Sequence, residues 1–353
     1  MSAAIEGLIN KPIFFERNRV RRVYKGGKLF GDFFGDEPVD EYQPEEWVAS
    51  TVRALNKDST DPLEGLSIVE GTNITFAGLL KQYRESLLGD LKSFDVLVKV
   101  LDSAVRLPLQ AHPDKEFSRK HFNSNFGKTE MWLILATRED AYICFGFKDK
   151  LTKEEFSQAI ERGREDKNAL SPLLNKVPVK PGEVYLIPAK CVHAIGYGCL
   201  ILEVQEPTDF TVQPEYWCDD YLLSDYEMYL GLDKSVALDC FDYGLYGPES
   251  ILRSKKKPRV ISDKPGHLHE SLISFEDTPC FAVERHTIFN SSVALETAPA
   301  IYIVIDGEGS LSGPGYSRQI HKGSYFFLPH CAKNSFLVKT DGKIQLAVCL
   351  PPE

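Results

Sequence analysis

The sequence of 353 residues lacks several features that would place it in a specialised class of protein. No apolar run approaches the roughly 20 residues that a membrane-spanning helix requires. Positive charge is not in excess, because 51 acidic residues outweigh 41 basic ones and give a formal net charge of -10. This balance argues against nucleic acid as the main partner. With 43% hydrophobic and 26% charged residues, the composition is that of a globular protein.

Paired cysteines and a targeting segment are also missing. The eight cysteines are scattered without a C-x-x-C motif, and most lie in apolar stretches such as YICFGF. This distribution predicts buried free thiols rather than disulfides or a zinc–thiolate site. The first fifteen residues, MSAAIEGLINKPIFF, contain no basic segment followed by an apolar core. We therefore expect no secretory signal and predict a cytoplasmic location.

Short strands outnumber helices in the predicted secondary structure. One helix is expected from Thr75 to Gly89, where apolar residues recur at helical spacing. A second begins at Thr152, which forms a capping box with Glu155, and a shorter one is expected over 168–176. Runs such as FDVLVKV, WLILA and GEVYLIP, bounded by Gly, Pro or Asp, indicate strands. The pattern and length predict a mainly β fold of about two sandwich or barrel domains with short helical insertions.

Two segments about 140 residues apart in the chain resemble each other. VKPGEVYLIPAKCVHAI (179–195) and IHKGSYFFLPHCAKNSF (320–336) each contain a glycine, five residues and a proline, with a polar residue five positions later. Such repetition indicates two related β domains. The basic stretch SKKKPR (254–259) lies between the segments, and we interpret it as a solvated linker.

Residues suited to holding a metal ion occur at three places. Gln110 and His112 are two positions apart at the end of a strand pattern, so they share a face, and Lys128 and Glu130 are arranged in the same way at the start of a later strand. His193 follows the Gly-x5-Pro turn of the first repeat. Two imidazoles, one carboxylate and one amide oxygen can hold a divalent metal with room for a substrate oxygen. The alternative is a set of structural histidines.

Two competing motifs are weaker. The GKT triplet at 127–129 does not form a phosphate-binding loop, because Phe122 stands where that motif requires glycine. His267 and His269 could form a second metal pair, but no acidic or histidine partner shows the right spacing. The basic stretch RNRVRRVYKGGK (17–28) indicates a solvated face, although its GG turn could approach a phosphate.

Taken together, these motifs resemble the type I phosphomannose isomerases, a family of bicupin metalloenzymes. PIFFE, the GG pair, LVKVLDS, LQAHPD, GKTEMW, P-x4-HAIG and LEVQEPTDF occur in family order along nearly the whole chain. LQAHPD, GKTE and HAIG are the specific part of the resemblance, because each would serve the same site from a different strand.

The resemblance implies two cupin-type β-barrel or jelly-roll domains. Residues 1–253 would form a catalytic, metal-binding cupin domain with helical insertions, and residues 258–353 a second, metal-free cupin domain. The second copy keeps the Gly-x5-Pro turn, but Lys333 or Asn334 stands where the ligand histidine would be. We therefore expect that copy to be structural.

The resemblance also implies the site residues and the reaction. The implied ligands of one Zn²⁺ per chain, or of another divalent transition metal, are Gln110, His112, Glu130 and His193. The implied reaction interconverts mannose 6-phosphate and fructose 6-phosphate through an enediolate, and Glu203 or Lys128 would move the proton. Gln213 stands where the family usually has an arginine linked to catalysis and phosphate charge, so it keeps hydrogen-bonding capacity without the charge.

Several alternatives stay open from the sequence. Glu203 could be a strand carboxylate paired with a lysine or arginine, and Lys128 a solvated loop lysine. Because Gln213 changes the pocket, the chain could isomerise another sugar or sugar phosphate, or bind metal and a sugar phosphate as a non-catalytic sensor. An anionic substrate requires a local positive patch, for which Lys25 and Lys28 are candidates. The expected partner is a small sugar phosphate rather than nucleic acid or a membrane, and the expected state is a monomer or weak homodimer.

Overall fold

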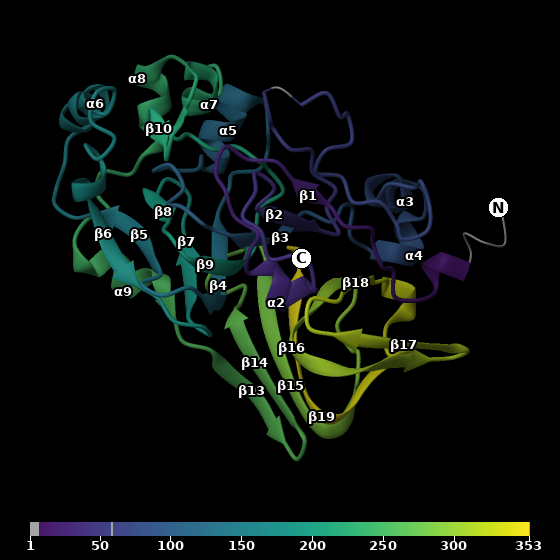
Figure 1. Cartoon of the computed structure of the whole chain (residues 1–353). Helices are drawn as coiled ribbons and strands as arrows, with labels where there is room; N and C mark the ends of the chain where they lie inside the picture. The colour runs from purple at the N-terminus through teal and green to yellow at the C-terminus, as the bar shows by residue number, and fades with distance from the viewer. Residues whose placement is uncertain (1–6, 58, 353) are drawn as a thin grey trace.

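The computed structural model describes residues 7–57 and 59–352 of the chain (Figure 1). Strands dominate and the helices are few and short, so the predicted mainly β fold is confirmed. Within these ranges, no helix is both long and apolar enough to span a bilayer.

The first large sheet comes from the N-terminal two thirds of the chain and has the strand order β1-β2-β3-β9-β4-β7-β12. Its strands are β1 (Arg19–Val20), β2 (Glu45–Val48), β3 (Leu97–Asp102), β4 (Glu130–Thr137), β7 (Val184–Ile187), β9 (Cys199–Gln205) and β12 (Lys255–Lys256). All of its neighbouring strands are antiparallel. A smaller sheet contains β5 (Tyr142–Phe147), β6 (Leu174–Pro178) and β8 (His193–Ile195), and β10 (Trp217–Cys218) pairs with β11 (Tyr221–Leu222).

Strand β9 shows by example why the central strands are apolar along most of their length. Leu200, Leu202 and Val204 belong to one core cluster, whereas Ile201 belongs to another. Both faces of the sheet are therefore buried, and such strands do not alternate between apolar and polar residues. Glu203 lies two positions after Ile201, so its side chain points to the same face.

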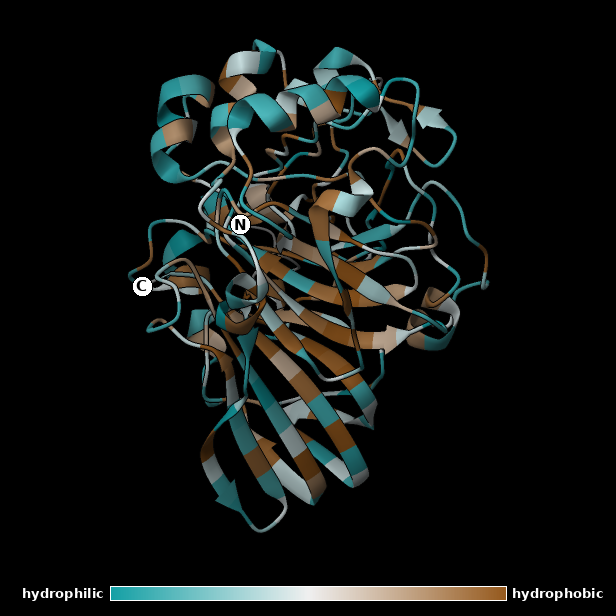
Figure 2. Cartoon of the chain, turned by 90° about the vertical axis from the view of Figure 1, so that its left-hand side faces the viewer, coloured by the Kyte–Doolittle hydropathy of each residue, from teal (hydrophilic) through white to brown (hydrophobic). Residues whose placement is uncertain are grey.

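The C-terminal part of the chain forms a second large sheet with the order β13-β14-β15-β19-β16-β17, and β18 also pairs with β16. Its strands are β13 (Arg259–Lys264), β14 (His267–Ile273), β15 (Ala282–Ala294), β16 (Ala300–Gly313), β17 (Tyr316–His321), β18 (Tyr325–Leu328) and β19 (Leu337–Leu350). In Figure 2, hydrophobic and hydrophilic residues alternate along the long strands in the lower part of the molecule. This pattern fits a sheet that buries one face and exposes the other.

The two large sheets share one apolar core. Met131 and Leu133 of β4 belong to the same buried cluster as Ile301 and Ile303 of β16. Near the N-terminus, Ile13 also forms a backbone bridge with Phe327 of β18. The two parts of the chain therefore pack against each other. The predicted domain limits remain a prediction.

The helices cover the edges and ends of the sheets (Figure 1). They are α2 (Phe30–Phe34), α3 (Phe76–Gln82), α4 (Arg84–Leu88), α5 (Lys115–Phe122), α6 (Lys153–Arg162), α7 (Asp225–Tyr229), α8 (Lys234–Ala237) and α9 (Pro248–Ser254), with 3-10 turns η1 (Ser171–Leu173), η2 (Leu238–Cys240) and η3 (His330–Ala332). The capping box of Thr152 and Glu155 is confirmed at the start of α6. Thr75 caps α3, but Tyr83 separates that helix from α4.

Two local predictions are wrong. The helix expected over 168–176 is the turn η1 followed by strand β6, because Leu174–Pro178 pairs with β5 instead of continuing a helix. The stretch 254–259 is not a free linker, because Lys255–Lys256 extends the first large sheet along β7. Lys255 also forms an ion pair with Glu183 at that edge.

The resemblance between the two repeated segments is structural. Gly182 and Gly323 both have positive φ angles, of 89° and 85°. Each is followed by a four-residue strand, β7 or β18, and then by a proline. The same glycine–strand–proline unit therefore occurs once in each of the two large sheets.

The cysteine prediction holds for all but one residue. All eight cysteines are free, and seven of them are buried. Cys331 is the exception, because it is exposed at the turn η3.

Candidate metal centre and substrate pocket

The four predicted metal ligands lie together in the interior. His112, Glu130 and His193 each offer a ligand atom, and these atoms lie within 4.8 Å of one another. His112 Nε2 is 3.2 Å from Glu130 Oε2, and His193 Nε2 is 3.4 Å from Glu130 Oε1. The side-chain nitrogen of Gln110 is 3.4 Å from His193 Nε2. Rotation of this amide by half a turn would present its oxygen at the same place.

The sheets bring these residues together from distant parts of the chain. Glu130 is the first residue of β4 in the large sheet, and His193 is the first residue of β8 in the small one. Gln110 and His193 are 83 residues apart, yet their backbones exchange two hydrogen bonds of 2.9 Å. The ligand set therefore bridges the two sheets.

Backbone carbonyls fix the orientation of both imidazoles. His112 Nδ1 lies 3.0 Å from the carbonyl oxygen of Phe210, and His193 Nδ1 lies 2.9 Å from that of Cys191. A carbonyl only accepts, so each Nδ1 carries the hydrogen and each Nε2 presents a lone pair toward Glu130. This is the arrangement by which proteins orient metal-binding histidines.

The charge states also fit a cation. Burial, followed by the charge of Lys128, lowers the pKa of His112 to about 3, and burial lowers that of His193. Burial alone would raise the pKa of Glu130, but Lys128 and the two histidines hold it well below the usual range. Two neutral imidazoles and a carboxylate thus face one another. Within the described chain, Glu130 Oε1 has no hydrogen-bond donor, so this donor set fits a divalent transition metal.

Lys128 is a buried part of this centre and not a solvated loop lysine. Its side chain is buried, and its Nζ lies 2.7 Å from His112 Nε2 and 2.9 Å from Glu130 Oε2. The two-residue spacing of Lys128 and Glu130 therefore places both on one face, as predicted.

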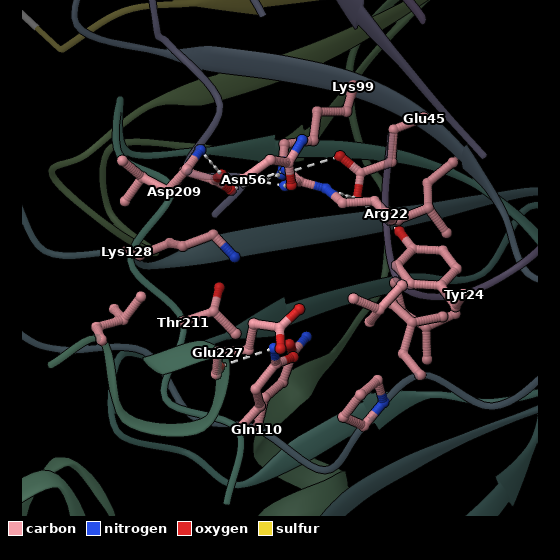
Figure 3. Close-up of a pocket in the computed structure, with 18 of the residues that line it drawn as sticks. Arg22, Tyr24, Glu45, Asn56, Lys99, Gln110, Lys128, Asp209, Thr211 and Glu227 are labelled. Atoms are coloured by element: carbon pink, nitrogen blue, oxygen red, sulfur yellow. Dashed lines mark hydrogen bonds and ion pairs between the residues drawn. The ribbon is translucent and has the colours of Figure 1, made fainter. Parts of the chain in front are cut away.

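A pocket of about 110 Å³ adjoins the ligands. Among the residues that line it are four of those predicted for the site, namely Gln110, Lys128, Glu203 and Gln213. In Figure 3, Lys128 points into the pocket, with Arg22, Glu45 and Asp209 on one side and Gln110 and Glu227 on the other. The structure thus brings the predicted catalytic and metal-binding residues to one place.

Glu203 is both a paired strand carboxylate and a pocket residue. It is buried on β9, where its Oε1 lies 3.3 Å from Lys99 Nζ and its Oε2 accepts a hydrogen bond of 3.2 Å from the Trp132 indole. Burial, and next the charge of Glu130, raise the pKa of Glu203 although Lys99 and Lys128 oppose the shift. The carboxylate is therefore held in place and is easier to protonate than an ordinary glutamate.

Gln213 uses its amide to hold the pocket wall. Its Nε2 donates a hydrogen bond of 3.0 Å to the carbonyl oxygen of Glu227 in α7, and its backbone nitrogen donates one of 3.0 Å to the carbonyl of Met228. The side chain is half-buried and lines the pocket. The side-chain amide nitrogen of Gln213 is thus bonded to α7, where it holds the pocket wall in place.

The pocket also contains a network of charged residues that the sequence analysis does not predict. Arg22 Nε lies 3.0 Å from Glu45 Oε1, and its Nη2 lies 2.9 Å from Asp209 Oδ1. Lys99 lies 3.7 Å from Glu45 and 4.0 Å from Asp209. The available signal was Lys99 itself, a charged residue in the middle of the apolar run FDVLVKV.

The GG turn lies outside this pocket, so the phosphate contact considered there stays a prediction. Gly27 donates its backbone hydrogen to Asp102 Oδ2 at 2.8 Å, and a side chain at Gly26 would collide with the Asp102 backbone. Lys25 and Lys28 are exposed and are not among the residues that line the pocket. The turn packs against the first large sheet, and Arg22 is the residue of the basic stretch whose side chain charge reaches the pocket.

The chain is similar in sequence and structure to proteins named mannose-6-phosphate isomerase. The family described as "Mannose-6-phosphate isomerase, cupin domain" matches residues 271–351. The chain is 31% identical over 332 residues to mannose-6-phosphate isomerase ManA of Bacillus subtilis (strain 168), covering 92% of this chain and 94% of that protein. It is 28% identical over 339 residues to mannose-6-phosphate isomerase of Streptococcus mutans, covering 92% and 94%.

The structural comparison agrees. The crystal structure of mannose 6-phosphate isomerase from Bacillus subtilis superimposes with a TM-score of 0.76 at 25% identity and covers 96% of this chain and 99% of that one. A structure described as a putative mannosephosphate isomerase from Archaeoglobus fulgidus has the same fold, with a TM-score of 0.73 at 17% identity, covering 97% and 98%. The predicted cupin-type fold is confirmed. By sequence and by fold, the chain belongs to the mannose-6-phosphate isomerase family.

Proposed function

We propose that this chain is a metal-dependent aldose–ketose isomerase that interconverts mannose 6-phosphate and fructose 6-phosphate. The observation that carries the proposal is the buried His112, Glu130 and His193 set, which adjoins a pocket that also presents Lys128 and Glu203. The relatives that bear the name of this activity match the chain over more than nine tenths of its length.

The proposed metal is one Zn²⁺ per chain, and the proposed ligands are Gln110, His112, Glu130 and His193. The same donors accept other divalent transition metals, so Zn²⁺ is the first choice and not the only fit. A bound Zn²⁺ would supply Lewis-acid stabilisation of the negative charge that develops on two neighbouring sugar oxygens in the enediolate.

The proposed base is Glu203, which would carry a proton between C1 and C2 of the sugar. Its buried carboxylate has a raised pKa, which suits a group that must both accept and return a proton near neutral pH. Lys99 and Trp132 hold the two carboxylate oxygens, so the base is positioned before substrate enters. Lys128 donates a hydrogen bond to Glu130, and we propose that it donates a proton to a sugar oxygen in the same step.

The proposed contact for the phosphate is Lys57 at the pocket wall. Arg22, Lys99 and Lys128 also line the pocket, but each already has an acidic partner. Lys57 is exposed, and the described residues offer it no ion pair. Its charge also acts on Glu227 in the same pocket, but an exposed lysine outside any close ion pair can bind an anionic group even though the whole chain carries a net charge of -10.

The proposed architecture is bicupin, with the catalytic cupin domain in residues 1–253 and the second cupin domain in residues 258–353. It is supported by the two Gly–strand–Pro units at β7 and β18 and by the family match at 271–351. We further propose that the chain acts in the cytoplasm as a monomer or weak homodimer.

A coupled assay with mannose 6-phosphate tests the function. We expect the purified protein to form fructose 6-phosphate, a chelator to abolish this activity, and Zn²⁺ to restore it. Tight Zn²⁺ binding without turnover of mannose 6-phosphate would contradict the proposal. Turnover of another sugar phosphate in its place would assign the pocket to a different substrate.

A further inference from the structure

A second cluster of histidines and a glutamate lies in the C-terminal sheet, on the adjacent strands β14 and β15 (Figure 1). The sequence showed His267 and His269 without a partner at a suitable spacing. The strand pairing supplies two: His269 lies directly opposite His286, and Ser271 lies opposite Glu284. Because alternate residues of paired strands point to one face, all four side chains meet there.

The donor atoms have separations that suit a small cation. His269 Nε2 lies 3.1 Å from Glu284 Oε2, and His286 Nε2 lies 3.5 Å from the same oxygen. One ligand atom from each of these three residues lies within 4.8 Å of the others. In a tetrahedral zinc site with bonds of about 2.0–2.1 Å, ligand atoms lie roughly 3.3 Å apart. The observed separations are close to that value.

His267 sets the orientation of one of these groups. Its Nε2 lies 3.0 Å from His286 Nδ1. Of the two nitrogens in this hydrogen bond, we assign the donor role to His286 Nδ1, because a metal-binding Nε2 must carry a lone pair. His286 Nε2 then presents a lone pair, and this buried nitrogen has no hydrogen-bond partner among the described residues. A second-sphere partner commonly orients a metal-binding histidine in this way.

The cluster faces a cavity and not bulk solvent alone. The three histidines line a cavity of about 150 Å³, together with apolar residues such as Leu346. Glu284 lies beside them, with its Oε2 3.1 Å from His269 Nε2 and 3.5 Å from His286 Nε2. One carboxylate and two imidazoles of the proposed ligand set therefore lie together beside the cavity.

Two further charged side chains line this cavity. Lys264 lies on β13 opposite His267 and opposes a cation, whereas Glu296 favours one. Their charges offset each other, so the fixed charge of Glu284 decides the local balance.

We propose that His269, Glu284 and His286 form a second site for a divalent transition metal such as Zn²⁺, with His267 as the residue that orients His286. Three protein ligands leave a fourth position for water or a small anion inside the cavity. The proposal does not depend on the isomerase function, because it uses none of the residues of the first centre. It replaces the expectation that residues 258–353 are free of metal.

Zinc stoichiometry tests this proposal on the full chain. Apo protein is titrated with Zn²⁺ in a calorimeter, and metal content after gel filtration is measured by elemental analysis. We expect two Zn²⁺ per chain for the unaltered protein and one for His269→Ala. His112→Ala should also retain one, at the C-terminal cluster. The matched control His321→Ala changes an exposed histidine of the same sheet and should retain two.

A conservative variant guards against misfolding. Glu284→Gln keeps the size of the side chain, and we expect at least a tenfold weaker second Zn²⁺ site with an unchanged circular dichroism spectrum. Co²⁺ in place of Zn²⁺ should give the absorption of a four-coordinate ion in the His112→Ala protein. A single Zn²⁺ per chain that is lost in His112→Ala and kept in His269→Ala, or a second Zn²⁺ whose affinity is unchanged in both Glu284→Gln and His269→Ala, would overturn the proposal.

Discussion

The two histidine–glutamate clusters of this molecule are built in different ways. The first joins residues from distant parts of the chain across two sheets, and its His112, Glu130 and His193 side chains are at most 1% exposed. The second comes from two neighbouring strands, and its His269, Glu284 and His286 side chains are 15–21% exposed. Similar donor atoms thus occur in a fully buried centre, which the whole fold assembles, and in a partly exposed one, which a single pair of strands assembles.

The comparison teaches that donor atoms do not by themselves define an isomerase. At the first cluster, Lys128 contacts His112 Nε2 and Glu130 Oε2. Glu203 lines the adjoining pocket, and its carboxyl has a raised pKa. At the second cluster the additional group is His267, which orients His286. The acid–base groups in the adjoining pocket are therefore our reason for proposing the first cluster as the catalytic one.

The largest effect on activity is expected when a histidine of the proposed catalytic cluster is replaced. We expect His112→Ala to lower kcat/KM for mannose 6-phosphate by about 10³-fold or more, because loss of a ligand removes the Lewis acid and several kcal/mol of transition-state stabilisation. The coupled assay and elemental analysis measure activity and metal together. The control His321→Ala should keep normal activity. Full activity in His112→Ala would remove this residue from the proposed centre.

The next largest effect is expected at Glu203, the proposed proton-transfer group beside the first cluster. We expect Glu203→Gln to lower kcat by about 10²–10⁴-fold with metal content unchanged, because the amide cannot accept the proton. Glu183→Gln, at the edge of the same sheet, serves as the control. If Glu203→Gln instead raised KM and left kcat intact, Glu203 would bind substrate and Lys128 would become the first candidate for the base.

Much of the first site could be predicted because its signals are local. Residues two apart on a strand share a face, so the pairs Gln110–His112 and Lys128–Glu130 indicated common surfaces before any fold was known. The capping box at Thr152 and the two Gly–strand–Pro units are local for the same reason. The prediction of a mainly β fold rested on many such short patterns.

What could not be predicted depends on register and on long-range pairing. Glu284 and His286 lie 15 and more residues from His269, and only the pairing of β14 with β15 brings them together. A shift of one residue would send them to the opposite face. Arg22 meets Asp209 across 187 residues, a contact that no spacing rule contains.

The pH dependence of activity further tests whether Glu203 acts as the base beside the first cluster. Glu203 must be deprotonated to act as a base, so activity is present above its pKa and is lost as the pH falls through it. Because burial raises this pKa, we expect the acid limb of kcat/KM to fall at a pH above the ordinary glutamate value of 4.5. Below the pKa the rate should drop about tenfold per pH unit. Metal content at each pH distinguishes this limb from metal loss, and the residual activity of Glu203→Gln should lack it.

A smaller effect is expected at the cation proposed for the phosphate. Lys57→Ala should raise KM for mannose 6-phosphate by about tenfold with little change in kcat, because one hydrogen bond between charged groups is lost at an exposed position. Lys25→Ala provides a matched control, since Lys25 is exposed but lies outside the pocket lining. An equal rise in KM in both variants would show that the effect is general charge rather than a contact.

The smallest effect is expected at Gln213, which lines the pocket wall. Gln213→Ala should raise KM about fivefold, because it removes a hydrogen bond of about 1 kcal/mol that ties the pocket wall to Glu227. Gln213→Arg should give no gain in the unaltered protein, since the exposed Lys57 already supplies a positive charge to the pocket, but should recover part of the lost affinity in a Lys57→Ala background. Steady-state kinetics of the unaltered protein, the three single variants and the double variant decide the point. If Gln213→Arg alone raised turnover, the missing charge would limit the reaction, and the pocket would not be fully adapted to its glutamine.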